Sequence, residues 1–239
     1  MTEPPPALLL TRPRAQSERF AAAFRAVLGD GPRVVIAPLL RIVPRAPAVD
    51  LNGLAGIVLT SENGLLALDA GTVPAGLVAY CVGDRTAAAA EAAGVSAISA
   101  GGAVDDLIAM IRSAPPDRPL LHLRGAESRG DLGGALRAAG IELQSVVAYD
   151  QVPAELTAEA AALLVGTAPV VAPVFSPRSA ALLSRPARNA VAPLHLAALS
   201  DAVAAAWDGP EPRSVTVAER PDAAAMLETL VTIYTGKSP

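Results

Sequence analysis

Short runs of apolar residues alternate along the chain with longer, alanine-rich stretches in which apolar residues recur every three or four positions. The first run, residues 8–11, precedes a turn and a helical stretch that Gly29 ends. The face of that helix expected to be buried consists of Phe20, Ala23, Phe24, Val27 and Leu28. Further strands are expected at residues 56–60, 78–82, 120–123, 143–147, 170–175, 194–199 and 214–217. All but 143–147 lead through a loop to a helix, which predicts an α/β fold with parallel sheets.

The chain also contains an internal repeat. Residues 8–25 resemble residues 120–137, which places Arg12 on Arg124. Residues 58–68 resemble residues 173–183, with Ser61 on Ser176. In the same order, residues 81–90 resemble residues 198–207. Because the order is kept and the spacing hardly drifts, we expect two similar halves.

A fourth pair of similar segments, residues 36–44 and 145–153, ends in Pro44 and Pro153. Prolines at such places mark the exits of strands from sheets. We therefore expect two flavodoxin-like α/β lobes with parallel sheets. The first is discontinuous, from residues 1–38 and 154–239, and the second spans 45–147. The segments 39–44 and 148–153 pair as a two-stranded β linker, with a ligand cleft between the lobes.

Composition narrows the possible partners of the protein. The 239 residues are 52% hydrophobic, carry a formal net charge of −4 and contain no basic block, which argues against a nucleic-acid partner. No apolar run reaches about 18 residues and no export signal begins the chain, so we expect a cytoplasmic protein without membrane association. Of the 19 basic residues only Lys237 is a lysine. Arginine suits carboxylate recognition, although genome composition also explains such a preference.

The loops that follow the predicted strands are small, rich in hydroxyl groups and often contain arginine. They are residues 11–13, 60–64, 82–86, 124–129, 175–179 and 199–201. Amides at a helix N-terminus, helped by Ser and Thr hydroxyls, bind anions, so these loops predict a polyanionic ligand. The alternative is that the polar residues only cap the helices.

Several other kinds of site lack their motifs. No phosphate-binding glycine loop follows a strand, and no nucleophile elbow is present. His122, His195 and Cys81 do not form a zinc spacing. Both histidines and the cysteine lie within apolar strand patterns, so we interpret them as packed side chains and expect neither a metal nor an organic cofactor.

The strings TSENG, VGDRTA, LRGAESR, YDQVP and FSPRSAALL occur in this order, and together they resemble the recurrent segments of uroporphyrinogen-III synthases. The resemblance covers the chain from Leu8 to about Leu230. It implies two α/β lobes joined by a two-stranded ladder, and a cofactor-free, cyclising hydro-lyase of tetrapyrrole biosynthesis. The implied substrate is hydroxymethylbilane, a linear polycarboxylate that the family closes to uroporphyrinogen III with inversion of ring D. We expect a monomer that receives its substrate from hydroxymethylbilane synthase.

The resemblance also implies site residues. Tyr149 matches the family's tyrosine and is the expected catalytic acid. The expected substrate-binding residues are Arg12, Thr60, Ser61, Asn63, Gly64, Gly83, Arg85, Thr86, Arg124, Gly125, Ser128, Ser176, Pro177, Arg178 and Ser179. One loop departs from the family, which commonly has Gly followed by Thr where this chain has Ser200 and Asp201. Asp201 would repel a carboxylate unless it caps a helix.

Two other functions remain open from the sequence. A non-catalytic, two-lobed binding protein for anions or other solutes would share the hinge and the two crossings. A flavin carrier would share the fold, but no aromatic residue follows Thr11 or Ser61 to stack on a flavin.

Overall fold

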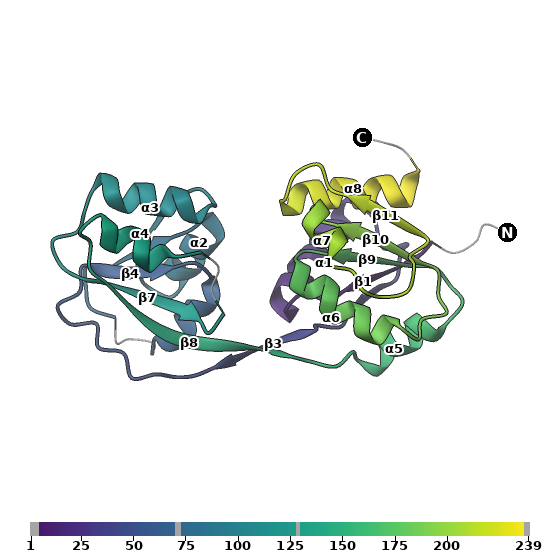
Figure 1. Cartoon of the computed structure of the whole chain (residues 1–239), viewed down its shortest axis with the longest axis horizontal. Helices are drawn as coiled ribbons and strands as arrows, with labels where there is room; N and C mark the ends of the chain where they lie inside the picture. The colour runs from purple at the N-terminus through teal and green to yellow at the C-terminus, as the bar shows by residue number, and fades with distance from the viewer. Residues whose placement is uncertain (1–4, 70–72, 128–129, 237–239) are drawn as a thin grey trace. The chain divides into compact units, whose positions relative to one another are not determined.

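The structure, a computed structural model, describes residues 5–69, 73–127 and 130–236. The chain divides into two compact units, each with its own sheet (Figure 1). The first unit consists of Met1–Arg41 and Pro153–Pro239, and the second of Ile42–Val152.

The first unit is built on a five-stranded parallel sheet in the order β11-β10-β9-β1-β2. Its strands are β1 (Ala7–Leu10), β2 (Val34–Ile36), β9 (Val170–Val174), β10 (Leu194–Ala198) and β11 (Ser214–Val217). Numbered along the unit, this order is 2-1-3-4-5, the flavodoxin-like arrangement.

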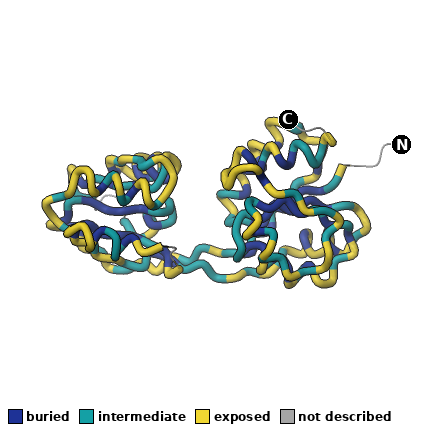
Figure 2. Tube along the Cα trace, turned by 45° about the horizontal axis from the view of Figure 1, so that its top comes forward, coloured by how far each residue is buried: buried dark blue, intermediate teal, exposed yellow. Residues whose placement is uncertain are grey.

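Helices cover both faces of this sheet, and the strands between them are buried (Figures 1 and 2). The helices are α1 (Arg14–Leu28), α5 (Ala158–Val165), α6 (Pro177–Ala187), α7 (Asp201–Ala205) and α8 (Ala223–Thr235). Phe20 and Phe24 of α1 pack with Leu230 of α8 against one face. Leu164 of α5 and Leu183 of α6 pack against the other. A parallel sheet needs apolar side chains on both faces, which explains why β1 and β9 are continuous apolar runs.

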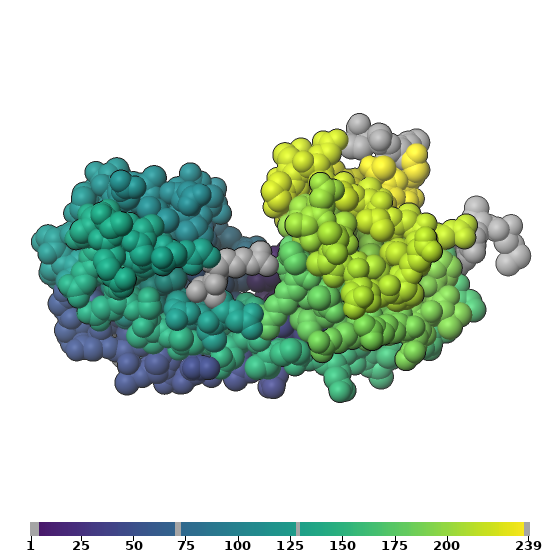
Figure 3. All heavy atoms as spheres, in the orientation of Figure 1, coloured from purple at the N-terminus to yellow at the C-terminus, as the bar shows by residue number. Residues whose placement is uncertain are grey.

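The second unit contains a six-stranded sheet in the order β3-β8-β7-β4-β5-β6. Its strands are β3 (Leu40–Pro44), β4 (Gly56–Leu59), β5 (Val78–Cys81), β6 (Ser96–Ser99), β7 (Leu120–Gly125) and β8 (Leu143–Pro153). Its helices are the 3₁₀ helix η1 (Glu62–Ala67), α2 (Asp84–Ala92), α3 (Val104–Ser113) and α4 (Leu132–Ala138). Apolar residues of η1 and α2 pack on one face of the sheet, and those of α3 and α4 pack on the other. Figure 3 shows atoms of α3 and α4 on the face of this unit turned to the viewer.

The two sheets correspond under the sequence repeat. The first sheet has the order β11-β10-β9-β1-β2. Each of these strands corresponds in turn to a strand of the second sheet, in the order β6-β5-β4-β7-β8. The pairing of Leu8 with Val34 matches the pairing of Leu120 with Leu143. The two halves of the sequence therefore form the same parallel arrangement.

Parts of the secondary-structure prediction are wrong. The strand expected at 143–147 and the linker strand at 148–153 form one strand, β8. The apolar pattern does not predict β2, which is only three residues long, or β6, whose four residues begin and end with serine. In α1 the side chains of Ala23 and Val27 are exposed, and Ser17 and Ala21 are buried with the two phenylalanines instead.

The strands β3 and β8 are neighbours where the chain passes between the units. The amide of Arg45 donates to the carbonyl of Ala148, and the amide of Ala154 donates to that of Leu39. Residue numbers rise on one strand as they fall on the other, which is antiparallel pairing. None of the helices in the described part of the chain has the length and apolar character that a bilayer span requires.

Candidate functional site

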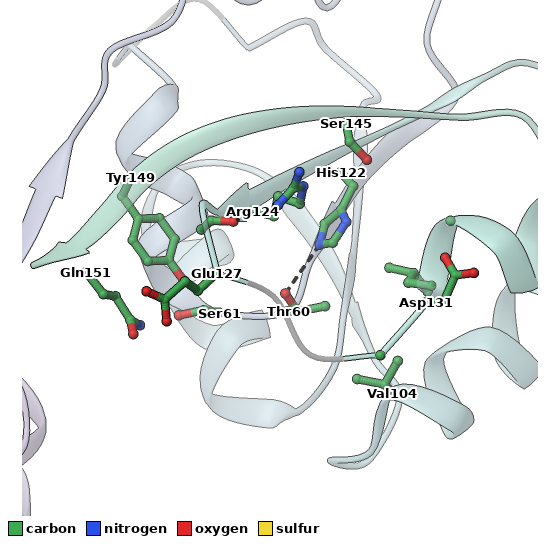
Figure 4. Close-up of a pocket in the computed structure, with 14 residues that line it drawn as sticks. Thr60, Ser61, Val104, His122, Arg124, Glu127, Asp131, Ser145, Tyr149 and Gln151 are labelled. Atoms are coloured by element: carbon green, nitrogen blue, oxygen red, sulfur yellow. Dashed lines mark hydrogen bonds between the residues drawn. The ribbon is translucent and has the colours of Figure 1, made fainter. Parts of the chain in front are cut away.

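A pocket of about 490 Å³ opens in the second unit, beside the carboxyl ends of β4 and β7 (Figure 4). Its lining residues come from β7 and β8, from the loops after β4 and β7, and from the starts of α3 and α4. They are Thr60, Ser61, Val104, His122, Arg124, Gly125, Glu127, Gly130, Asp131, Leu132, Gly133, Ser145, Tyr149 and Gln151. Ligands of parallel sheets bind at this edge, because the loops that follow the strands meet there.

Alternation along β7 places two polar side chains of the pocket together. Leu121 and Leu123 point into the core shared with η1 and α2. His122 and Arg124 project to the opposite face, where they line the pocket. Thr60 and Ser61 directly follow β4, and the Ser61 hydroxyl accepts a hydrogen bond from the Asn63 amide at the start of η1.

His122 is a buried, neutral imidazole in the wall of the pocket. Its side chain is 5% exposed, and its Nε2 lies 3.3 Å from the Thr60 Oγ1, a hydrogen bond drawn in Figure 4. Burial, and secondarily the charge of Arg124, lowers the pKa of His122 to about 4. The imidazole can therefore share a proton with Thr60 but carries no charge near pH 7.

Charged side chains of both signs line the same pocket. The Arg124 Nη1 donates to the carbonyls of Gly125 and Ala126, at 3.0 and 3.2 Å. These bonds hold the guanidinium at the turn and leave its other N–H donors available for a ligand carboxylate. Asp131 accepts from the Gly134 amide at 2.8 Å and caps α4, so its charge is already offset by the helix N-terminus. Glu127 adds a second carboxylate to the lining.

Tyr149 lies on β8 and is 5% exposed. Its ring packs in the core with Leu123, while its edge lines the pocket. In Figure 4 the ring of Tyr149 points toward Ser61 and Glu127. Gln151, two residues further along β8, lines the same pocket. The pocket thus combines one phenol, one arginine, two carboxylates and several neutral hydroxyl groups.

Five of the residues predicted from the sequence line this pocket: Thr60, Ser61, Arg124, Gly125 and Tyr149. Another five lie in the second unit but do not line it: Asn63, Gly64, Gly83, Arg85 and Thr86. Gly64 is buried against β7, where a Cβ would stand 2.5 Å from the Leu123 carbonyl oxygen. Its role in the structure is therefore close packing of η1 on β7. Ser128 lies outside the described residues.

The remaining predicted residues belong to the first unit: Arg12, Ser176, Pro177, Arg178 and Ser179. The Arg12 guanidinium stacks over the Phe175 ring with its Cζ 4.3 Å from the centroid, and its Nε donates to Gln16 at 3.1 Å. Ser176 and Ser179 form a capping box at the start of α6. The local capping role that the sequence left open is thus present at this loop.

The loop that departs from the family is also a helix start. Ser200 is the N-cap of α7 but makes no side-chain capping bond, and Asp201 is the exposed first residue of this short helix. Asp201 therefore does not cap α7 as an N-cap residue, and its carboxylate disfavours a bound carboxylate at this loop.

Sequence reasoning missed nine lining residues of the pocket, which are Val104, His122, Glu127, Gly130, Asp131, Leu132, Gly133, Ser145 and Gln151. The sequence contained a signal for two of these residues, His122 and Gln151. Strand alternation relates His122 to Arg124 and Gln151 to Tyr149. Ser145 lies on β8, opposite His122. The other six come from loops and helix starts, whose approach to the sheet depends on packing.

The other candidates for polar chemistry are packed side chains. Cys81 is buried in β5, and burial raises the pKa of its thiol to about 11. The His195 Nδ1 lies 2.8 Å from the Ser214 Oγ between two strands of the first unit, and burial lowers the pKa of His195. Within the described residues, His, Cys, Asp and Glu side chains nowhere form a group of three or more able to hold a metal ion.

The lowered pKa of His122 predicts a pH-dependent stability. The unfolded chain takes up a proton at about pH 6.5, whereas the folded protein does so only at about pH 4. The free energy of unfolding should therefore fall by roughly 3 kcal/mol as the pH drops through this window, at about 1.4 kcal/mol per pH unit. His122→Gln should remove this contribution to the fall in the free energy of unfolding, as measured by urea unfolding at several pH values. Parallel pH profiles for the two proteins would contradict the prediction.

Three comparisons with known proteins bear on the family and the fold of the chain. The family model described as "Uroporphyrinogen-III synthase HemD" matches residues 19–228. A uroporphyrinogen-III synthetase structure from Helicobacter pylori is similar with a TM-score of 0.64 at 16% identity, covering 85% of this chain and 94% of the other. A mutant uroporphyrinogen III synthase structure from Thermus thermophilus has a TM-score of 0.49 at 16% identity, covering 97% and 100%. No curated protein matches the sequence. Since the family model spans most of the chain, the protein belongs to the uroporphyrinogen-III synthase HemD family.

Proposed function

We propose that the protein is a cyclising hydro-lyase that converts hydroxymethylbilane into uroporphyrinogen III. The match to the family model over residues 19–228 carries this proposal. The pocket of the second unit supports it, because Arg124 can bind a carboxylate there and Tyr149 offers a phenol. Hydroxymethylbilane carries acetate and propionate groups on each pyrrole, so arginine and hydroxyl donors suit it.

The proposed reaction begins with loss of the hydroxyl from the hydroxymethyl group on ring A. This leaves an electrophilic azafulvene, which the substituted carbon of ring D attacks to form a spiro intermediate. The bond between the spiro carbon and the methylene that joins it to ring C then breaks. The free α-carbon of ring D attacks this methylene and loses its proton, which inverts ring D and closes the macrocycle. A hydrogen bond from the Tyr149 phenol to the departing hydroxyl would stabilise its loss as water.

Most of the proposed catalysis is conformational. The linear substrate can close unaided to the type I isomer without inversion, so the enzyme must hold the chain in the bent geometry that favours attack at the substituted carbon. We propose that arginines and backbone amides hold the carboxylates, while neutral groups such as His122 and Thr60 line the pocket without repelling them.

The test of the function is the identity of the product. We expect purified protein mixed with freshly generated hydroxymethylbilane to yield mainly the type III isomer, resolved by chromatography after oxidation to porphyrins. Buffer alone should give type I. Binding of hydroxymethylbilane without a change in isomer ratio would support the non-catalytic binding protein instead.

Arg12→Ala and Arg124→Ala test carboxylate binding. Each should raise KM by about tenfold, because a charge-assisted hydrogen bond contributes roughly 1.5 to 3 kcal/mol before solvent screening. Arg112→Ala, which removes an exposed arginine of α3 away from the pocket, is the matched control. If KM is unchanged in both test variants relative to this control, neither arginine binds the substrate.

Tyr149→Phe tests the proposed acid with little change of shape. The rate of type III formation should fall by about 100-fold to 10,000-fold, since general-acid assistance has this magnitude, and type I should accumulate. Tyr80→Phe on β5, which does not line the pocket, should retain the parent rate and isomer ratio. A Tyr149→Phe variant with full rate would remove the phenol from the mechanism.

A further inference from the structure

The backbone of Tyr149 lies at an irregularity in the pairing of β7 with β8. Arg124 pairs with Val147, but the next residue, Gly125, pairs with Tyr149, so Ala148 is an extra residue in β8. The Ala126 amide donates to the Tyr149 carbonyl at 2.9 Å, which continues the ladder beyond the shift. This is a β-bulge, a feature that redirects side chains and occurs often beside active sites.

The bulge turns the Tyr149 ring over the backbone of Gly125. Ala148 and Tyr149 both belong to the core that η1 and α2 share with the sheet, although neighbours on a regular strand face opposite sides. A Cβ at position 125 would stand 2.9 Å from the Tyr149 Cζ and 3.1 Å from its hydroxyl oxygen. Because real Cβ atoms avoid such distances, any side chain at residue 125 must displace the hydroxyl end of the ring.

The repeat shows that this arrangement belongs to one half of the chain. In the sequence alignment Gly125 corresponds to Pro13, and Tyr149 corresponds to Leu40. The equivalent strands β1 and β2 pair from Leu8 to Leu10, and this pairing ends before the position equivalent to Gly125. The glycine and the tyrosine therefore occur together in the second unit, and the first unit has neither of them at the equivalent positions.

On the side of β8 that faces β3, hydrogen bonds from Arg45 hold the residues on either side of Tyr149. The Arg45 amide donates to the Ala148 carbonyl at 2.9 Å. The Arg45 guanidinium also binds Asp150 with two hydrogen bonds, at 2.7 and 2.9 Å. Arg45, directly after β3, thus binds the residues on either side of Tyr149. Ala126, directly after β7, binds the carbonyl of Tyr149 itself.

We infer that Gly125 is a positioning residue whose missing side chain, together with the bulge at Ala148, sets the place of the Tyr149 hydroxyl in the pocket. Gly125 then acts through Tyr149 and is not a substrate contact. The activity part of this inference rests on the proposed function of Tyr149, whereas the placement of the ring does not.

A stability cycle tests the placement without reference to activity. Gly125→Ala should lower the midpoint temperature of unfolding by about 4 °C when the ring is present, because overpacking costs about 1 to 3 kcal/mol. In a Tyr149→Ala background the same substitution should lower it by less than about 1 °C, since the clashing ring is gone. Gly31→Ala, where a Cβ meets no atom within 4 Å, should leave the midpoint unchanged in both backgrounds.

An equal loss of stability in both backgrounds would overturn the inference, because the added methyl group would then clash with something other than the ring. No loss in either background would overturn it as well. If Gly125→Ala does not fold, recovery of folding in the double variant with Tyr149→Ala would support the inference, and failure of both would count against it.

Turnover provides the second measurement. Gly125→Ala should lower kcat for the type III isomer by about 100-fold with KM nearly unchanged, and combining it with Tyr149→Phe should add little, since both changes remove the same phenol. A raised KM with unchanged kcat would instead make Gly125 a substrate contact and overturn the inference. If the parent protein forms no type III isomer, the proposed function fails, while the stability cycle still decides where the ring lies.

Discussion

The parallel pairing of β7 with β8 is the constraint on which the pocket depends. Strand hydrogen bonds hold the two backbones side by side, so residues far apart in sequence, such as His122 and Ser145, become direct neighbours. The same pairing, shifted by one residue at Arg124 and Gly125, brings Tyr149 beside the turn that carries Arg124. A pairing without the shift would place Ala148 opposite Gly125 and turn the phenol to another direction.

Burial decides the charge of the groups around this pairing. His122 lies between the sheet and its helices, so desolvation keeps the imidazole neutral, and the nearby Arg124 acts in the same direction. Arg124 remains able to attract a carboxylate because part of its guanidinium reaches the pocket. Asp131 and Glu127 also line the pocket, and the charge of Asp131 is offset by the N-terminus of α4, which it caps. Arg124 is thus the group of the pocket that attracts a carboxylate of a polyanion, while the hydroxyl groups offer neutral hydrogen bonds.

The repeat explains why two units with the same strand order differ in chemistry. Each sheet needs helices on both faces, and this requirement preserves the apolar strands in both halves. The loops at the carboxyl ends carry no such requirement, so they differ. Pro13 stands where the second unit has Gly125, and the equivalent of Ser61, Ser176, forms a full capping box with Ser179. Arg12 stacks on Phe175, whereas Arg124 binds carbonyls of its own turn.

The sequence by itself determined the α/β class, the repeat and the family, because apolar periodicity and ordered motifs are local properties of the chain. It also indicated Thr60, Ser61 and Arg124, since polar residues directly after apolar strands must lie at one edge of a parallel sheet. Tyr149 came instead from the resemblance to the family's recurrent segments. The continuity of β8, the bulge at Ala148 and the closeness of Gly125 to Tyr149 were decided only by the tertiary structure. They depend on the register between two strands, and a register shift leaves no mark in either strand alone. The place of His122 in the pocket wall was decided in the same way, because an apolar strand pattern does not say whether a polar residue within it meets the core or a cavity.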